Sequence, residues 1–385
     1  MKTASASAAR APITLSAAQA RRFALHALGL MMPHSTVADV LGHHGYVQID
    51  PINVCGRMHD LILRPRLTGY REGDLMRFVH GETETLPAER RAAFEHHLPS
   101  TGILVVLENE AWPFLQGAMR ARSRRAGAWS GKLTAREAEL APRLLAEITA
   151  RGPLGSDAIE DKRAGVRTWG TSTLVKATLQ KLFFHGRLLI ARREAGRRLY
   201  DLPEHVLPAA VLARPAATEA EIARWEATLK LRQRRLTPLK RGELAAVTDL
   251  VQPIRVEGAP LLYALRTDAG LLERVRDPAK RNGSEAVEAL TRLLAPLDPL
   301  IYDRVVTRAL WDFDYTWEVY TPPLRRKRGY YALPLLAGEA LVGHVDPKAD
   351  RKAGKLTTVS REVRRGHTTA AGAALKELAR FLELR

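Results

Sequence analysis

The sequence predicts an α+β fold made of tandem winged-helix repeats, each a helix-turn-helix unit followed by a β-wing. Three observations support this prediction. Apolar residues recur at helical spacing in several segments, short strand-like segments follow them, and the strand pairs turn at positions that contain glycine. Basic residues gather on these same segments, which favours an extended binding surface over a single basic tail.

Composition limits the class of protein. The 385 residues include 60 Lys plus Arg and 42 Asp plus Glu, for a net charge of +18, and 46% are apolar. This length suggests two or three domains with real cores. The charge favours a polyanionic partner, either DNA, RNA or an anionic membrane. No segment approaches the roughly 20 apolar residues of a spanning helix, so no membrane protein is expected.

The single cysteine and the first residues bear on location. Cys55 stands alone, which excludes an intramolecular disulfide and a Cys-based zinc site. Residues 1–13 lack the apolar core of a secretory signal and are expected to be flexible. We therefore expect a cytoplasmic, nucleoid-associated protein.

The positive charge is clustered. Residues 119–136 hold six basic residues and no acidic one, and residues 162–200 hold ten basic residues and one acid. Residues 224–242 hold seven basic residues, and residues 325–328 read RRKR. Clusters at several places indicate a long surface that follows a polyanion.

The N-terminal part predicts two helices and a strand. Residues 15–30 have a helical apolar face, with Ser16 as N-cap. Residues 36–44 suggest a second, short helix. Residues 46–50 (YVQID) alternate in polarity, and Pro51 closes the strand.

The central part gives the clearest winged-helix pattern. We expect a helix over 137–152, a turn and short helix over 152–161, a strong helix over 169–186 and a hairpin over 187–202 that turns at Glu194–Gly196. A plain α+β module is the alternative. The arginines of the wing favour DNA contact; they are Arg192, Arg193, Arg197 and Arg198.

The rest of the chain repeats the theme less clearly. The expected elements are a helix at 218–236, a hairpin at 251–266, a helix-rich stretch at 284–320, strands at 330–336 and 340–346, and a helix at 369–384. The predicted winged-helix domains are 14–118, 119–215 and 216–385.

Gln48 and Asp50 are the candidate chemical pair. They stand two apart on the expected strand, so both side chains should face the same way. A carboxylate beside a carboxamide can hold and polarise a water, or stabilise positive charge developing on a sugar. Taken alone, the spacing favours a structural role, because Asp before Pro commonly ends a strand.

Other candidate residues are weaker. Four histidines could suggest a metal site: His43, His44, His96 and His97. Adjacent histidines on a helix diverge, however, and no acidic partner stands at ligand spacing, so we expect ordinary surface histidines. Asp298, Asp303 and Arg304 suggest a charge pair that orients the fold. Tyr330 and Tyr331 could stack on nucleic acid or pack in a strand core.

Two long motifs resemble those of a known family. GYVQIDPINVCGRMHDLILRPRL and APLDPLIYDRVVTRALWDFDYTWEVYTPPLRRKRGYYALPLLAGEALVGHVDPKADRKAGKL resemble signatures of the bacterial winged-helix DNA glycosylases, the YcaQ/AlkZ/AlkX family. The resemblance covers roughly residues 14–360. Gln48-Ile49-Asp50 corresponds to the Gln-x-Asp pair of the YcaQ/AlkX branch, whereas AlkZ has Gln-x-Gln.

The resemblance implies three tandem winged helices with a concave basic surface, excision of N7-alkylguanines and, in some members, unhooking of interstrand crosslinks. It implies no metal or organic cofactor, Gln48 and Asp50 as catalytic residues, and a monomer on double-stranded DNA with alkylated bases. Arg57 and His59, just downstream, are expected to contact the DNA backbone, although Arg57 serves equally well as a local cap. The wing arginines, with Arg325 and Arg326, are expected on phosphates.

Two departures from the family pattern stand out. The family usually continues FE-Y/H-W-x-H, and here Phe94 and Glu95 match while Pro99 holds the later His position. The family's P-F-D is P-L-D at Pro296–Asp298. Three rivals therefore stay open: a non-catalytic winged-helix DNA-binding protein (a regulator or repair accessory factor), an inactive or redirected family member, and an RNA-binding protein.

Overall fold

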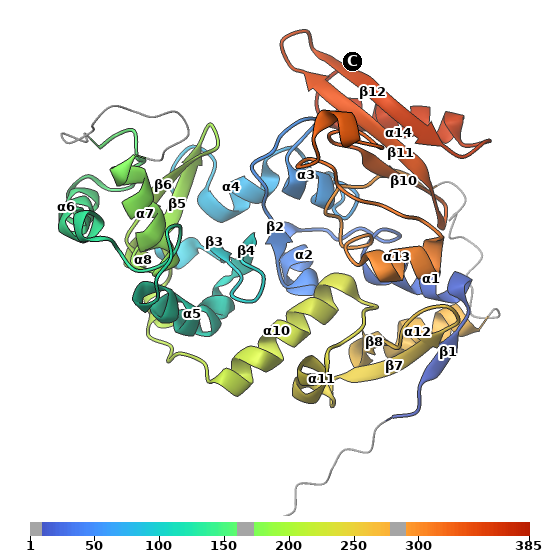
Figure 1. Cartoon of the computed structure of the whole chain (residues 1–385), viewed down its shortest axis with the longest axis horizontal. Helices are drawn as coiled ribbons and strands as arrows, with labels where there is room; N and C mark the ends of the chain where they lie inside the picture. Colours follow the sequence, from blue (N-terminus) through green and yellow to red (C-terminus); the bar gives the residue numbers. More distant parts are fainter. Residues whose placement is uncertain (1–9, 160–172, 278–289) are drawn as a thin grey trace, which may run out of the picture. The chain divides into compact units, whose positions relative to one another are not determined.

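The computed structural model describes residues 10–159, 173–277 and 290–385 and shows an α+β chain with small sheets (Figure 1). Within these residues the strands form four sheets of two to four strands each. No helix in these ranges is long and apolar enough to cross a lipid bilayer. The predicted α+β class is confirmed at this level.

The chain divides into two compact units. The larger unit takes its described residues from 10–45, 50–72, 223–277 and 290–385, and the smaller unit takes them from 46–49, 73–159 and 173–222. The three winged-helix domains expected at 14–118, 119–215 and 216–385 remain a prediction.

The first sheet of the larger unit joins distant parts of the chain. Strand β1 (Ile13–Leu15) lies parallel to β7 (Val251–Val256), which pairs antiparallel with β8 (Leu262–Leu265). The predicted hairpin at 251–266 is thus confirmed. The expected flexible terminus is corrected at its end, because Ile13 already pairs with β7; residues 1–9 lie outside the described residues.

Helix α1 (Ala17–Ala27) begins where the sequence predicts. The Ser16 hydroxyl accepts the backbone N–H of Gln19, and the Gln19 side chain accepts the N–H of Ser16. This reciprocal capping stabilises the helix start by about 1 kcal/mol. The predicted cap is confirmed, but Leu15 belongs to the strand and not to the helix.

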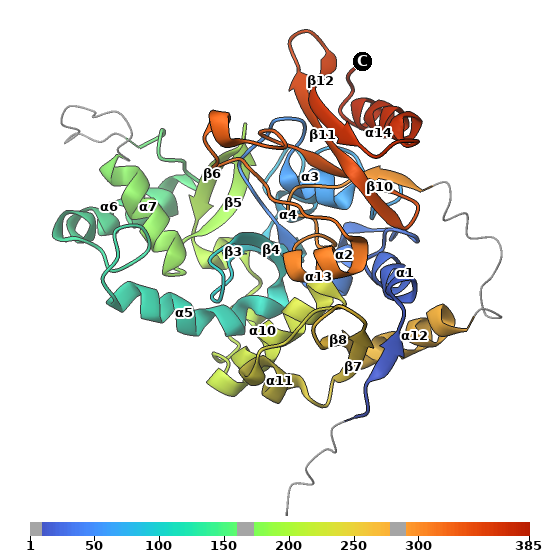
Figure 2. The same cartoon turned by 45° about the vertical axis from the view of Figure 1, so that its right-hand side comes forward.

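A second sheet ends the chain. Strands β9 to β12 follow one another in the order β12-β11-β10-β9, and α14 lies alongside them in both views (Figures 1 and 2). The buried core between this sheet, α3 and α14 includes Cys55, Met58 and Tyr331. The elements of this core are α3 (Met58–Leu63), β9 (Thr291–Leu293), β10 (Leu333–Ala337), β11 (Ala340–Asp350), β12 (Lys355–Val363) and α14 (Thr368–Phe381).

Further helices complete the larger unit: α2 (Val37–His44), α10 (Glu219–Arg234, from residue 223 on), α11 (Arg241–Val247), α12 (Ala269–Arg276) and α13 (Arg304–Trp311). The predicted helices at 36–44, 218–236 and 369–384 are confirmed. The expected helix-rich stretch at 284–320 is wrong where it is described, since 290–320 contains strand β9 and a single α-helix, α13. Residues 284–289 lie outside the described residues.

The smaller unit contains a three-stranded sheet in the order β2-β4-β3 and a two-stranded hairpin. Its elements are β2 (Val47–Gln48), α4 (Asp74–His80), β3 (Ala93–His97), β4 (Leu104–Glu108), α5 (Trp112–Arg124), α6 (Ala135–Arg151), α7 (Leu174–Phe184), β5 (Leu189–Glu194), β6 (Arg197–Asp201), α8 (Pro203–Val206) and α9 (Ala209–Leu212). The expected strand at 46–50 is shorter than predicted, because pairing stops at Gln48.

The predicted wing is confirmed as a hairpin. β5 pairs antiparallel with β6, and the turn passes through Ala195 and Gly196 at φ 48° and 83°. Both angles belong to the left-handed region that a two-residue hairpin turn requires. The helix over 137–152 is confirmed as α6, and the helix over 169–186 as α7, with residues 169–172 outside the described residues. The short helix expected in 152–161 is absent from 152–159, where the chain forms turns and Leu154 pairs with Tyr200.

Candidate active site

Gln48 is held by the central sheet of the smaller unit. Strand β2 pairs antiparallel with β4, which sets Gln48 opposite Val105, and the backbone N–H of Ile49 donates to Leu104 O over 2.9 Å. The neighbours Val47 and Ile49 are buried, while Gln48 is half-buried. Within the described residues nothing hydrogen-bonds the Gln48 carboxamide. Its backbone is therefore fixed while its polar group remains available.

Asp50 directly follows this strand segment. Its Oδ1 accepts the backbone N–H of Ile52 at 2.9 Å, across Pro51. We expected the side chains of Gln48 and Asp50 to share one face of a strand, because side chains alternate between the faces of a strand. Strand β2 ends at Gln48, so this alternation does not extend to Asp50. The local turn, rather than a strand, fixes the Asp50 carboxylate.

The electrostatics of Asp50 suit a reacting carboxylate. Burial raises the pKa of Asp50, and the hydrogen bond from Ile52 partly offsets this rise. Within the described residues no Lys, Arg or His forms an ion pair with it. A half-buried carboxylate without a countercharge is both a stronger base than usual and a strong source of negative potential.

Tyr331 lies in the same electrostatic neighbourhood, within the larger unit. Burial raises its pKa far above the usual value, and the negative charge of Asp50 raises it further. Its phenol oxygen is buried without a hydrogen-bond partner in the described residues, and its ring lies 5.9 Å from that of Trp317. A buried hydroxyl without a partner costs about 1–3 kcal/mol, so it points to an unfilled interaction.

The sequence left two roles open for Tyr331: stacking on nucleic acid or packing in a strand core. It is a core residue by burial, with no exposed surface. Asp346 fixes it, because the Asp346 carboxylate accepts the backbone N–H groups of Tyr330 at 2.9 Å and Tyr331 at 3.1 Å. The electrostatic effect of Asp50 on Tyr331 depends on tertiary structure, and no local pattern signals it.

Arg57 and His59, just downstream of Gln48 and Asp50, differ in burial. Arg57 is half-buried at the N-cap of α3, where its side chain makes no capping hydrogen bond. His59 is buried inside α3, only 2% exposed and 3.6 Å from Asp60. The expectation that His59 contacts the DNA backbone stays a prediction, and the burial of its side chain does not favour it.

The wing arginines do not form one free basic face. Arg193 forms a two-pronged ion pair with buried Glu95, at 2.6 and 2.5 Å. Burial alone would raise the pKa of Glu95, but the Arg193 charge lowers it overall, helped by a 2.8 Å contact from His80. Arg193 therefore joins the wing to β3.

The other three wing arginines are more accessible. Arg192 donates to Thr83 O, and Arg197 pairs with Asp157 while its side chain stays 62% exposed. The Arg198 guanidinium lies 5.7 Å from the centre of the Phe183 ring. These contacts orient the side chains without burying the charges.

Arg325 and Arg326 precede Lys327 on a loop that Glu318 organises. One carboxylate oxygen of Glu318 accepts three successive backbone N–H groups, at 2.9, 2.7 and 3.3 Å, from Lys327, Arg328 and Gly329. Arg325 is exposed at the loop, and Arg326 is half-buried, 4.8 Å from the Tyr330 ring centre.

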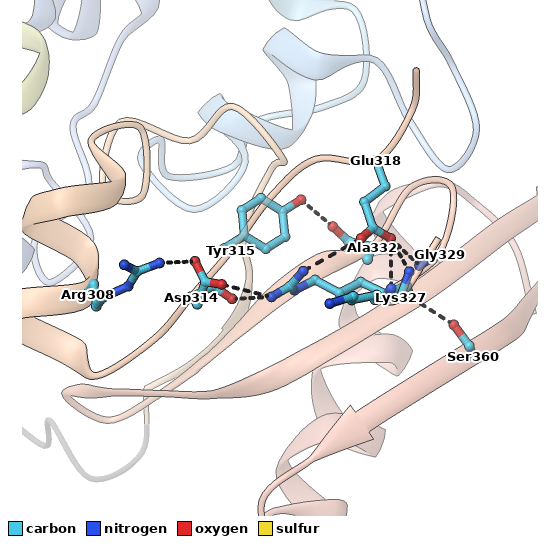
Figure 3. A network of polar contacts seen from close by, with 9 residues as sticks. Arg308, Asp314, Tyr315, Glu318, Lys327, Gly329, Ala332 and Ser360 are labelled. Carbon is cyan, nitrogen blue, oxygen red and sulfur yellow. Dashed lines mark hydrogen bonds and ion pairs between the residues drawn. The ribbon is translucent and has the colours of Figure 1, made fainter. Parts of the chain in front are cut away.

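Other polar contacts brace this loop. Arg328 donates to Asp314 O at 2.8 Å, Arg308 pairs with the Asp314 carboxylate at 2.9 Å, and the Tyr315 hydroxyl donates to Ala332 O at 2.6 Å (Figure 3). Tyr320 and Leu324 on the loop are largely exposed, at 85% and 101%. The loop thus presents cationic and apolar groups on a rigid base.

The histidines expected at the surface are mostly buried. In β3, His96 donates from Nε2 to Phe183 O and His97 donates from Nδ1 to Gly102 O. Burial lowers their pKa to about 3 and about 4. His44 is 2% exposed. The surface prediction is wrong because these rings supply apolar surface as well as nitrogen atoms. Pro99 lies in the turn after β3.

The expected orienting charge pair is found, with a different partner. Asp298 accepts two hydrogen bonds from Arg66, both 2.7 Å, and both side chains are fully buried. Asp303 instead caps α13 by accepting the N–H groups of Val305 and Val306.

Two comparisons with known proteins complete the description. A family model described as "DNA glycosylase AlkZ-like" matches residues 41–381. Among solved structures, the chain resembles the DNA glycosylase AlkZ of Streptomyces sahachiroi with a TM-score of 0.57. The two sequences are 16% identical, and the match covers 97% of this chain and 98% of the other.

Proposed function

Because the chain belongs to the family of AlkZ-like DNA glycosylases, we propose that it excises alkylated purines, above all N7-alkylguanines, from double-stranded DNA. Family membership makes the chain a DNA glycosylase with DNA as its partner. The observation that carries the finer proposal is the state of Asp50, a half-buried carboxylate that forms no ion pair with any residue the structure describes.

The chemistry follows from the lesion. Alkylation at N7 places positive charge on the base, so the bond between N9 and the sugar carbon C1′ breaks with little acid catalysis. The electron pair of that bond neutralises the departing base. The Asp50 carboxylate stabilises the oxocarbenium-like sugar and accepts a proton from the water that forms the new C1′–O bond.

Gln48 has a supporting role in this proposal. Its carboxamide can donate to and accept from a water or the deoxyribose, which would orient the attack. The segment Gln48-Ile49-Asp50 contains no lysine to form a Schiff base with the sugar. The proposed product is an abasic site, and the enzyme is monofunctional.

Tyr331 extends the proposed site. Its buried hydroxyl has no hydrogen-bond partner in the described residues, and the charge of Asp50 raises its pKa. We assign it the task of donating a hydrogen bond to Asp50 or to the attacking water. Such a bond would hold the carboxylate orientation that Ile52 N–H fixes at its other oxygen.

We assign the binding of duplex DNA to positive charges on tandem winged helices that form a concave basic surface. In this proposal the protein acts as a monomer. Arg57, Arg192 and Arg197 would contact phosphates, as would Arg198, Arg325 and Arg326. Arg193 would hold the wing in place through Glu95. A site that acts on crosslinked strands must stay open at the groove, because a base tethered to both strands cannot rotate into a closed pocket.

The test is direct. Purified protein is incubated with duplex DNA that carries one N7-methylguanine, and alkali then cleaves any abasic site. We expect free N7-methylguanine and alkali-dependent cleavage at that position, and no cleavage without alkali. A duplex with an interstrand crosslink through N7 tests unhooking. Tight binding without base release on both substrates would favour the non-catalytic DNA-binding alternative.

A further inference from the structure

Three histidines of the larger unit meet in one place. His34 precedes α2, and His43 and His44 form its last turn. One ring nitrogen from each lies within 4.8 Å of the others. The centre of the His43 ring is 4.7 Å from that of His34 and 4.9 Å from that of His44. Adjacent histidines on a helix diverge, but here the ring of His34 lies close to both.

Their hydrogen bonding is incomplete within the described residues. His44 is 2% exposed, and neither of its ring nitrogens has a partner. Nε2 of His34 is also buried without a partner. Leaving a buried nitrogen without a hydrogen bond costs about 1–3 kcal/mol, so three such atoms at one place indicate a missing ligand.

A backbone carbonyl fixes which ring nitrogen of His43 is available to a ligand. Its Nε2 lies 2.7 Å from Ala27 O. A carbonyl oxygen only accepts, so Nε2 carries the proton and Nδ1 keeps the lone pair. A backbone carbonyl that fixes the tautomer of a histidine is the usual outer contact of a metal-bound imidazole.

The surroundings of the three rings accommodate a cation. Arg66, Arg232 and Arg235 place positive charge around the rings; Asp298 pairs with Arg66 and Asp268 with Arg235, while Arg232 donates to His43 O. The Asp39 carboxylate also acts on His34. Gly29, at φ +70°, leaves room for the ring, because a Cβ there would meet His34 Nε2 at 3.1 Å.

We propose that His34, His43 and His44 bind a divalent first-row transition cation of the Zn²⁺ type. Imidazole nitrogens suit such ions, with Zn–N distances of about 2.0–2.1 Å. Two nitrogens on one ion are then roughly 3.4 Å apart, so ring rotations that shift a nitrogen by about 1 Å complete the site. The ion would tie the segment before α2 to its last turn. This proposal is independent of the glycosylase chemistry.

Metal titration tests the proposal on the full chain. EDTA-treated protein is titrated with Zn²⁺ by calorimetry, and with Co²⁺ by visible absorption, which reports nitrogen ligation. We expect one tight equivalent per chain in the parent. His34→Gln should bind Zn²⁺ roughly 100-fold more weakly or worse and lose the Co²⁺ band. His205→Gln, a histidine with a 48% exposed side chain, is the control and should bind like the parent.

A second readout covers variants that fold poorly. Saturating Zn²⁺ should raise the Tm of the parent and of His205→Gln, because the ion binds only the folded chain, and should leave the Tm of His34→Gln unchanged. His44→Gln, at the most buried position, is compared only if its circular dichroism matches the parent. Identical Zn²⁺ binding by the parent and His34→Gln, or no tight equivalent in the parent, would overturn the proposal.

Discussion

At the residue scale, the account depends on one carboxylate. Asp50 is half-buried, one of its oxygens accepts the Ile52 N–H, and within the described residues no cation pairs with it. An ion pair would have stabilised the ground state and weakened the field at the sugar. The lack of a countercharge is what fits Asp50 to a cationic transition state.

The pH dependence of excision should report Asp50. Its pKa is raised from 3.8 by burial, and the charged form is the active one. Excision by the parent should therefore fall as pH decreases through a value above 3.8, measured as single-turnover rates over a pH series on N7-methylguanine DNA. An acid limb at or below the ordinary Asp value would contradict this assignment.

The same shift has a consequence for stability. A raised folded-state pKa means that the folded chain favours the neutral carboxyl, so this contribution to stability is present at low pH and lost as pH rises through the folded pKa. Asp50→Asn should thus keep or raise the Tm at neutral pH, measured by calorimetry. A lower Tm would indicate that Asp50 is structural.

Tyr331→Phe separates a role in the site from a role in the core. Because its buried hydroxyl has no partner in the described residues, removal should keep or raise the free energy of unfolding, by up to about 1–3 kcal/mol. Excision should fall about tenfold or more, since a hydrogen bond to a charged group contributes about 1.5 kcal/mol or more.

Tyr315→Phe is the matched control. Its hydroxyl donates to Ala332 O at 2.6 Å, so this variant should lose about 1 kcal/mol of stability and keep its excision rate. If Tyr331→Phe behaves in the same way as this control, Tyr331 is a core residue alone.

At the element scale, the wing is held by a buried ion pair. Glu95→Gln leaves Arg193 without its partner and should destabilise the protein by roughly 3–5 kcal/mol in urea unfolding. Because the pKa of Glu95 is lowered, this contribution exists above its unfolded pKa of 4.5 and is lost as pH falls toward the folded value.

Asp157→Asn gives the comparison on the same hairpin. It removes the exposed pair with Arg197, which should cost less than about 1 kcal/mol. Equal losses in the two variants would show that the Glu95 pair does not hold the wing.

The elements with local signals were predictable. Ser16 and the Ala195–Gly196 turn act through neighbouring residues, so helix α1 and the wing hairpin were expected close to their observed places. Strands β3, β4 and β12 were not expected. Their register depends on pairing with distant partners, and the sequence FEHH carries polar residues that the core nonetheless buries.

The candidate site shows the same division. Gln48 and Asp50 were visible as a spacing and as part of a family motif. The contribution of Tyr331 and the burial of His59 depend on how α3 and β10 pack in one core, which no local pattern reports. Likewise, His34 stands nine residues before His43, and only the fold brings their rings together.

At the scale of the whole molecule, the net charge of +18 should control DNA affinity. The logarithm of duplex affinity should fall steeply and linearly with the logarithm of salt concentration, measured by fluorescence anisotropy. Arg325→Gln and Arg197→Gln should each reduce the slope by about one and weaken binding equally on all sequences. A flat salt response would remove the electrostatic basis for docking.

The central claim is that charge docks the DNA and Asp50 carries the chemistry. The most direct measurement is the single-turnover rate of N7-methylguanine excision by Asp50→Asn, beside its duplex Kd at the same salt, with Asp249→Asn, an exposed ion-pair residue, as control. We predict a loss of at least about 10²-fold in rate, with Kd within about threefold of the parent. An Asp50→Asn protein that binds DNA and excises at the parent rate would contradict the account.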